Sequence, residues 1–134
     1  MAKIFLSYRF TGEDLNELEQ LLSSMKHSLE GTKNVVTCSF FLESFFREQH
    51  FTTDQIYEYM LKEQGKCDTF MALLKSDEKS KGMLLESEQA QQLGQRYVVV
   101  YKRGIYIAQF HTHAHQLIEY SDHSELQERL KSFS

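Results

Sequence analysis

The sequence predicts an α/β fold: a doubly wound, mostly parallel five-stranded sheet with helices on both faces. Two observations predict it. The segments with strand character are continuous apolar runs, as expected for strands that are covered on both faces. Segments with helical periodicity separate these runs, which is the alternation that a parallel sheet requires. The length of 134 residues is typical of one domain, so we expect a single domain over residues 1–134.

Short runs rich in β-branched and aromatic residues predict the five strands. The clearest of them reads YVVVY and occupies Tyr97–Tyr101. In chain order, the expected strands are Lys3–Tyr8, Val35–Phe41, Thr69–Leu74, Tyr97–Tyr101 and Leu117–Tyr120.

Apolar residues spaced three or four positions apart predict the helices. Gly31 and Gly94 act as stop signals for two of them, and Thr53 or Asp54 is the expected cap of another. The expected helices are Leu15–Leu29, a helix that begins near Thr53 and includes Ile56–Leu61, Met83–Leu93 and Ser124–Phe133.

Composition and charge narrow the functional classes. Fifteen Lys and Arg residues against nineteen Asp and Glu residues give a net charge of −4 without a basic tract, so we do not expect a nucleic acid polymer as partner. No apolar run approaches the roughly 18 residues of a membrane span, and the start of the chain lacks a signal-peptide pattern. Two cysteines, Cys38 and Cys67, are too few for a disulfide framework. We therefore expect a cytoplasmic protein that does not act at a membrane.

In a doubly wound sheet, ligands bind outside the carboxyl ends of the strands, near the switch in strand order. The segments that this rule selects are Ser7–Asp14, Phe40–Phe51, Lys75–Glu86 and Lys102–His115. The second of them is a predicted loop with five phenylalanines, a cluster that is costly to leave in water. We expect it to form a lid or a subunit contact of a homodimer or higher homo-oligomer, with Phe45 or Phe46 beside the base of a ligand.

The segment Ser7–Asp14 has the composition of an anion site. A hydroxyl at Ser7 and a guanidinium at Arg9 stand at a strand–helix turn, where the amides of the next helix N-terminus can also bind a phosphate. The single glycine excludes a dinucleotide fingerprint and a P-loop. The alternative is an ordinary turn in which Thr11 or Asp14 caps the helix and Arg9 is solvated, and the segment taken alone favours it.

The segment around Glu86 is the second candidate. Ser80 and Gly82 precede a helix whose first turn is expected to present Glu86 at the carboxyl end of the third strand. A carboxylate near a helix N-terminus is stabilised as the anion, which suits a nucleophile. The alternative is a solvated glutamate at a helix start, and the segment taken alone favours it. We expect Glu88, on a different face, to be solvated.

Together these segments resemble the nucleoside 2-deoxyribosyltransferase superfamily, in particular its branch of 2′-deoxynucleoside 5′-monophosphate N-glycosidases. The resemblance extends from about Lys3 to Tyr120, and the spacing from Gly82 to Glu86 to Ala90 is its most specific part. The matching motifs are Ser7-x-Arg9 with Glu13-Asp14, then Cys67-Asp68, then Ser80-x-Gly82-x-x-x-Glu86-x-x-x-Ala90.

This resemblance implies a flavodoxin-like, deoxyribosyltransferase-like fold and an enzyme without a cofactor that cleaves or transfers the N-glycosidic bond of a nucleoside or its 5′-monophosphate. Glu86 would be the nucleophile that attacks the anomeric carbon. The expected 5′-phosphate and substrate site comprises Ser7, Tyr8, Arg9, Ser80 and Gly82.

The chain departs from the family pattern at Met60. The family has an aspartate eight residues before the position of Asp68, and this count falls on Met60. Because a methionine cannot transfer a proton, we expect this departure to affect catalytic turnover and not the fold.

A second resemblance is weaker. Phe5–Arg9, which reads FLSYR, is similar to the opening box of TIR domains, some of which cleave NAD with a glutamate about where Glu86 falls. The alternative functions are therefore a TIR-like NAD-cleaving domain and a non-catalytic nucleotide-binding or interaction module.

No metal site is expected. His111, His113 and His115 alternate with other residues, but no fourth ligand is evident, so they favour a polar loop or a helix start.

Overall fold

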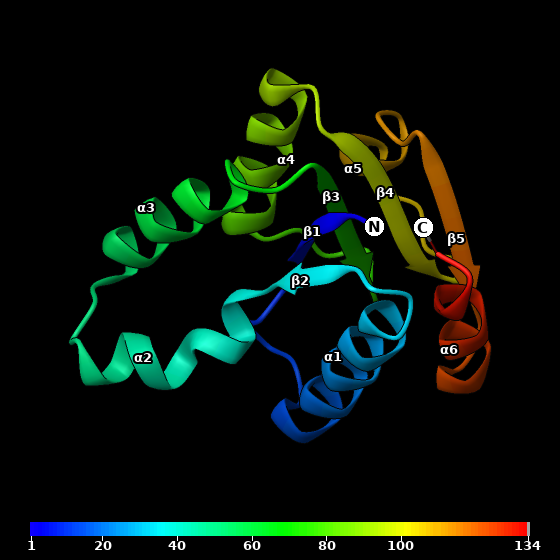
Figure 1. Cartoon of the computed structure of the whole chain (residues 1–134), viewed down its shortest axis with the longest axis horizontal. Helices are drawn as coiled ribbons and strands as arrows, with labels where there is room; N and C mark the ends of the chain where they lie inside the picture. The colour runs from blue at the N-terminus through cyan, green and yellow to red at the C-terminus, as the bar shows by residue number, and fades with distance from the viewer. Residues whose placement is uncertain (134) are drawn as a thin grey trace.

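Figure 1 shows the computed structural model of the chain, which describes residues 1–133. Over these residues the strands form one parallel sheet in the order β2-β1-β3-β4-β5, which is the order of flavodoxin-like folds. The predicted fold class is therefore confirmed. The strands are β1 (Lys3–Ser7), β2 (Val35–Thr37), β3 (Thr69–Leu74), β4 (Arg96–Lys102) and β5 (Gln116–Tyr120).

Helices cover both faces of the sheet. In Figure 1, α1 and α6 lie on one side of the strands, and α4 and α5 lie on the other. The helical elements are α1 (Leu15–Glu30), the 3₁₀ helix η1 (Ser39–Leu42), α2 (Glu43–Glu48), α3 (Thr53–Gln64), α4 (Lys81–Leu93), α5 (Ala108–His111) and α6 (His123–Lys131).

Two apolar clusters, one on each face, hold the layers together. On the first face, Ile4 and Leu6 of β1 pack with α1 and α6. On the second face, Phe5 of β1 packs with Phe70 of β3 and with residues of α3, α4 and α5. Every residue of β3 is buried, because this strand lies at the centre of the sheet between β1 and β4. Covering on both faces explains why the strands are continuous apolar runs.

The predicted helix boundaries are close to the observed ones, and capping side chains account for the differences. Asp14 caps α1, since its carboxylate accepts a hydrogen bond from the Glu17 amide at 3.0 Å. The expected cap of α3 at Thr53 or Asp54 is wrong by one or two residues. Thr52 caps this helix because the Gln55 side chain reaches back to the Thr52 amide at 2.8 Å and completes a capping box.

The segment Val35–Phe41 is not one strand, which corrects the sequence prediction. The strand ends at Thr37, and the chain enters η1 and then α2. Aromatic packing explains the change: Phe46 is 3% exposed and belongs to the second core cluster, and its ring stacks on those of Phe45 and Phe51. Helical turns bring these rings onto one another, whereas an extended loop would leave them in water. The predicted aromatic loop is therefore mostly helical.

No helix among residues 1–133 is both long enough and apolar enough to span a membrane.

Candidate functional site

A cavity of about 660 Å³ lies where the strand order reverses, between the carboxyl ends of β1 and β3. Doubly wound sheets bind ligands at this place. The end of β1, the start of α4, one side of α3 and the η1–α2 segment all contribute to its walls. The polar and charged residues that line it are Tyr8, Arg9, Thr11, Ser39, Glu43, Thr53, Tyr57, Lys79, Ser80, Lys81 and Glu86.

Glu86 lines this cavity, and Ser7, which is buried and does not line it, binds the Glu86 carboxyl group. Ser7 is the last residue of β1 and is 1% exposed, and Glu86 is in the second turn of α4. The Ser7 hydroxyl donates to Oε1 of Glu86 across 2.6 Å. The predicted convergence of these two segments is therefore observed, although Ser7 binds the carboxylate here and its role as a phosphate ligand stays a prediction.

The environment of Glu86 differs from the one that the sequence indicates. The helix begins at Lys81, earlier than predicted, so Glu86 is not in the first turn, where the helix dipole would favour its anion. Burial raises the pKa of Glu86 to about 7, and the hydrogen bond from Ser7 opposes this rise. The carboxyl group therefore exchanges a proton near neutral pH. Glu88, as predicted, is exposed to solvent.

A buried amide network holds the backbone of Glu86. The Gln64 side chain, fully buried at the end of α3, donates to the Glu86 carbonyl oxygen at 2.8 Å and to Oε1 of Gln95 at 3.1 Å. Gln95 in turn donates to the carbonyl oxygens of Gln64 and Cys67, both at 2.9 Å. These bonds tie α3 to α4 at the level of the site. Sequence reasoning missed them, because Gln64 and Gln95 are 31 positions apart and carry no local signal of their contact.

Arg9 is not solvated as the plain-turn alternative supposes. Its guanidinium lines the cavity and pairs with Glu13 at 3.0 Å and with Glu78. Gly12 permits this position: its φ is +82°, and a Cβ there would lie 2.9 Å from Nη2 of Arg9. Lys75 also pairs with Glu13 at 3.0 Å. These carboxylates hold Arg9 beside the cavity. An anionic ligand would bind Arg9 either in place of one of them or in addition to them.

Cationic groups gather at the start of α4. The Ser80 hydroxyl accepts a hydrogen bond from the Met83 amide at 3.0 Å, so Ser80 is the cap of this helix. Lys79 and Lys81, which flank it, also line the cavity. The sequence prediction named Ser80 but not these lysines, although their place on either side of the cap was the available signal. With Arg9 and the amides of the helix N-terminus, they make this end of the cavity suitable for an anion. We call Arg9, Lys79, Ser80 and Lys81 the cationic end.

An apolar wall faces the cavity along α3. Met60 is 2% exposed and lines the cavity with Ile56. Gly82 allows α3 to approach α4, since a Cβ at Gly82 would lie 3.3 Å from Cε1 of Tyr57. These groups present an apolar wall beside Glu86, which is consistent with the raised pKa of its carboxyl group.

Tyr8 lies in the same cavity and remains protonated. Its hydroxyl accepts a hydrogen bond from Ser39 at 3.3 Å, and its ring packs edge-on against Phe40. Burial, followed by the charge of Cys38, raises the pKa of Tyr8 well above its usual value. The phenol is therefore a hydrogen-bond donor at neutral pH.

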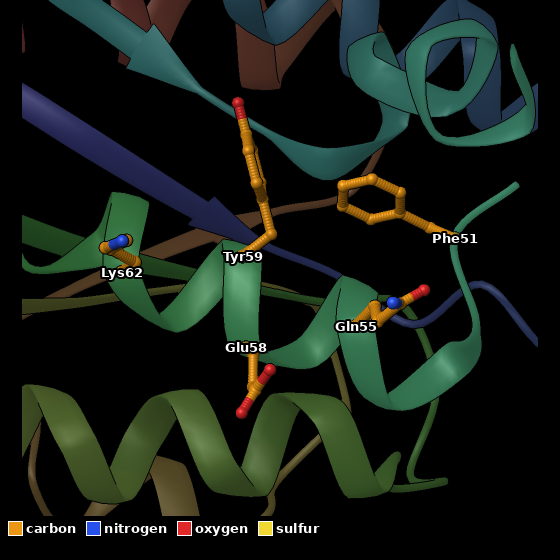
Figure 2. Close-up of a pocket in the computed structure, with 5 residues that line it drawn as sticks. All are labelled: Phe51, Gln55, Glu58, Tyr59 and Lys62. Atoms are coloured by element: carbon orange, nitrogen blue, oxygen red, sulfur yellow. The ribbon is translucent and has the colours of Figure 1, made fainter. Parts of the chain in front are cut away.

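Phe45 and Phe46 do not line this cavity. Both rings pack against those of Phe51 and Tyr59, with ring centroids 5.4–5.6 Å apart. A second cavity of about 490 Å³ opens beside this cluster, on the outer side of α3 (Figure 2). Figure 2 shows Tyr59 and Glu58 pointing from opposite sides of α3, with the Phe51 ring beside the helix. The contact of Phe45 or Phe46 with a base stays a prediction that would need a second subunit. The lining residues of this second cavity are Phe51, Gln55, Glu58, Tyr59 and Lys62.

The histidine series forms backbone contacts. Nδ1 of His115 accepts a hydrogen bond from the Tyr97 amide, and Nδ1 of His111 accepts one from the Ile107 amide, both at 3.0 Å. Over the residues that the structure describes, no three His, Cys, Asp or Glu side chains are placed to hold a metal ion.

Known proteins resemble this chain in three-dimensional structure. No family model and no curated protein matches it. The CMP N-glycosidase BcmB of Clostridium botulinum superimposes with a TM-score of 0.67 at 20% identity, covering 96% of this chain and 97% of that one. A 2-deoxyribosyltransferase from Bacillus psychrosaccharolyticus has a TM-score of 0.70 at 15% identity, with 99% and 93% covered. The SEFIR domain of IL-17 receptor B has a TM-score of 0.57 at 14% identity, with 96% of both chains covered. The likeness confirms the deoxyribosyltransferase-like fold.

The raised pKa of Glu86 predicts a pH-dependent cost to stability. Because folding raises this pKa from 4.5 to about 7, the stabilising contribution is complete below pH 4.5 and is lost as the pH rises through 7. We expect Glu86→Gln, which stays neutral, to match the wild type near pH 4 and to exceed it above pH 7. At about 1.4 kcal/mol per pH unit, the gain in the free energy of unfolding is roughly 3 kcal/mol.

Urea unfolding from pH 4 to pH 9 measures this difference. Glu88→Gln is the matched control, since Glu88 is on the same helix and exposed. An equal difference between Glu86→Gln and wild type at every pH would contradict a titrating buried carboxyl.

Proposed function

We propose that this chain is a single-domain enzyme that cleaves or transfers the N-glycosidic bond of a nucleoside or its 5′-monophosphate. One observation carries the proposal: the carboxyl group of Glu86, a half-buried residue, lies beside an apolar wall and is oriented by Ser7 in the cavity at the strand switch. The similarity in fold to a CMP N-glycosidase and to a 2-deoxyribosyltransferase supports it.

Glu86 acts as the nucleophile in this proposal. Its ionised carboxylate attacks C1′ of the sugar through an oxocarbenium-like transition state and forms a glycosyl ester. The hydrogen bond from Ser7 holds one oxygen in place, and the bond from Gln64 holds the backbone. Water then releases the sugar, or a second base accepts it. Because apolar walls raise the energy of the free anion, the carboxylate gains stabilisation as positive charge develops on the sugar.

The cationic end binds the 5′-phosphate of the substrate. The guanidinium of Arg9, the ammonium groups of Lys79 and Lys81 and the amides at the start of α4 all lie in the same cavity as Glu86. A phosphate held there would place the sugar next to the carboxylate. The base would then extend toward Met60 and the η1–α2 segment.

Base release should depend on Glu86 and not on Glu88. We expect the wild-type protein to release free base from one or more members of a panel of deoxynucleosides, ribonucleosides, their 5′-monophosphates and NAD. Glu86→Ala should lose this activity by several kcal/mol of transition-state stabilisation, roughly 1,000-fold or more in kcat/KM. Chromatography of the free base measures both.

Glu88→Ala is the control and should keep the activity. Retention of activity by Glu86→Ala with loss in Glu88→Ala would show that the nucleophile is the other carboxylate. If NAD is the only substrate cleaved, with release of nicotinamide, the TIR-like alternative is favoured. NAD is included in the panel because the fold is also similar to that of a SEFIR domain.

The phosphate contact should appear as a difference between nucleotides and nucleosides. We expect Arg9→Met to lower kcat/KM for a 5′-monophosphate roughly 10- to 100-fold, because a charge-assisted hydrogen bond contributes about 1.5–3 kcal/mol. The value for the matching nucleoside should change little. Lys62→Met, which removes a cation from the second cavity, is the control and should leave both substrates unchanged. An equal loss on both substrates would contradict the assignment.

We also propose that the protein is a homodimer or a higher homo-oligomer that associates through the α2–α3 region. Phe45 is 39% exposed although it stands in an aromatic cluster, and the second cavity adjoins it. A two-fold contact covers such a surface with one set of residues.

Sedimentation equilibrium at micromolar concentration should therefore give at least the mass of a dimer. Phe45→Asp should shift the mass toward the monomer, whereas Ser44→Asp, which adds the same charge at the exposed neighbouring position, should not. Phe46 is buried and is not a suitable position for this test. A monomer mass of 15.8 kDa for the unaltered chain would contradict the proposed homo-oligomer.

A further inference from the structure

The proposed cleavage requires a proton donor that the cavity must supply. When C1′–N breaks, the electron pair stays on the base nitrogen, and an unprotonated base is a poor leaving group. Glu86 cannot give this proton while it attacks as an anion. Met60, which forms the wall beside it, has no proton to give. The donor must therefore be another group that lines the cavity.

Most of the titratable groups that face the cavity are unsuited to this role. Arg9 is engaged in ion pairs with Glu13 and Glu78. Lys79 and Lys81 stand at the cationic end, where the phosphate is proposed to bind. Burial raises the pKa of Tyr8, which makes its phenol a weaker acid than usual. The titratable residues that line the cavity are Tyr8, Arg9, Glu43, Tyr57, Lys79, Lys81 and Glu86.

Glu43 is the remaining carboxyl group, and its position fits the requirement. It is the first residue of α2, half-buried, in the wall that also contains Ser39 and Tyr8. Glu43, Glu86 and Tyr8 line the same cavity, and the charges of both carboxyl groups contribute to the raised pKa of Tyr8. Over residues 1–133, no hydrogen bond or ion pair engages the Glu43 carboxylate, which leaves it available to a ligand. It also comes from a different element than the cationic end.

We propose that Glu43 is the acid/base catalytic residue of this site, an inference that rests on the proposed function. In the first step, Glu86 bonds to C1′ as C1′–N breaks, and the carboxylic acid of Glu43 gives its proton to the departing nitrogen. In the second step, the Glu43 carboxylate takes a proton from water. The water oxygen bonds to C1′, and the electron pair of the ester bond returns to Glu86. One carboxyl group is therefore the nucleophile and the other is the acid/base, as in retaining glycosidases.

The test compares leaving bases of different acidity in Glu43→Gln. On an ordinary base that needs a proton, we expect kcat/KM to fall roughly 100-fold or more. On a base that leaves without a proton, such as an N7-methylated purine or a 5-nitro pyrimidine, the loss should shrink to less than about 10-fold, since the missing proton no longer matters. With such a substrate, the second step lacks its base, so intact-mass spectrometry should detect a sugar adduct on the variant and none on wild type.

The control is Glu48→Gln, on the same helix but exposed and outside the cavity, which should behave as wild type. An equal loss on ordinary and activated bases without an adduct would overturn the proposal and assign Glu43 a structural role. Full activity of Glu43→Gln beside an inactive Glu86→Gln would also overturn it and leave the proposed function intact. No base release by the wild-type protein from any substrate would overturn the proposed function itself, and this inference with it.

Discussion

The burial of one carboxyl group at the switch point of the sheet is the constraint on which the rest of the site depends. Taking Glu86 out of water disfavours its charged form, which is why its pKa rises to about 7. The fold offsets part of this cost with the 2.6 Å hydrogen bond from Ser7 and holds the helix backbone with Gln64. Both contacts require β1, α3 and α4 to meet at one level, so the order of the parallel strands and the position of the carboxyl group are linked.

The surroundings of Glu86 are divided by charge. Arg9 and the two lysines that flank Ser80 lie at one end of the cavity, and Met60 and Ile56 form an apolar wall. A cavity with a cationic end and an apolar wall suits a substrate that has an anionic and an apolar part. Glu43 enters from α2 as a second carboxyl group. The division therefore supports a nucleotide as ligand more than a free anion.

Much of the fold was predictable because its signals are local. Apolar runs and helical periodicity located the strands and the main helices, and Gly94 ends α4 in the left-handed conformation that a stop signal implies, at φ +66°. Local signals failed at Val35–Phe41, where the residues favour a strand but the chain turns into η1 and α2 after Thr37. Packing of Phe46 into the core outweighed the strand propensity there.

The sequence by itself determined the parallel α/β architecture and placed Ser7, Arg9, Ser80 and Glu86 in segments that meet at one edge of the sheet. Only the tertiary structure decided how these groups are used: Ser7 binds Glu86, a residue 79 positions away, and Glu43 and Lys79 join the cavity. The reason is physical. Strand and helix formation depend on neighbours within a few residues, whereas hydrogen bonds, burial and pKa values depend on which side chains the packed layers bring together.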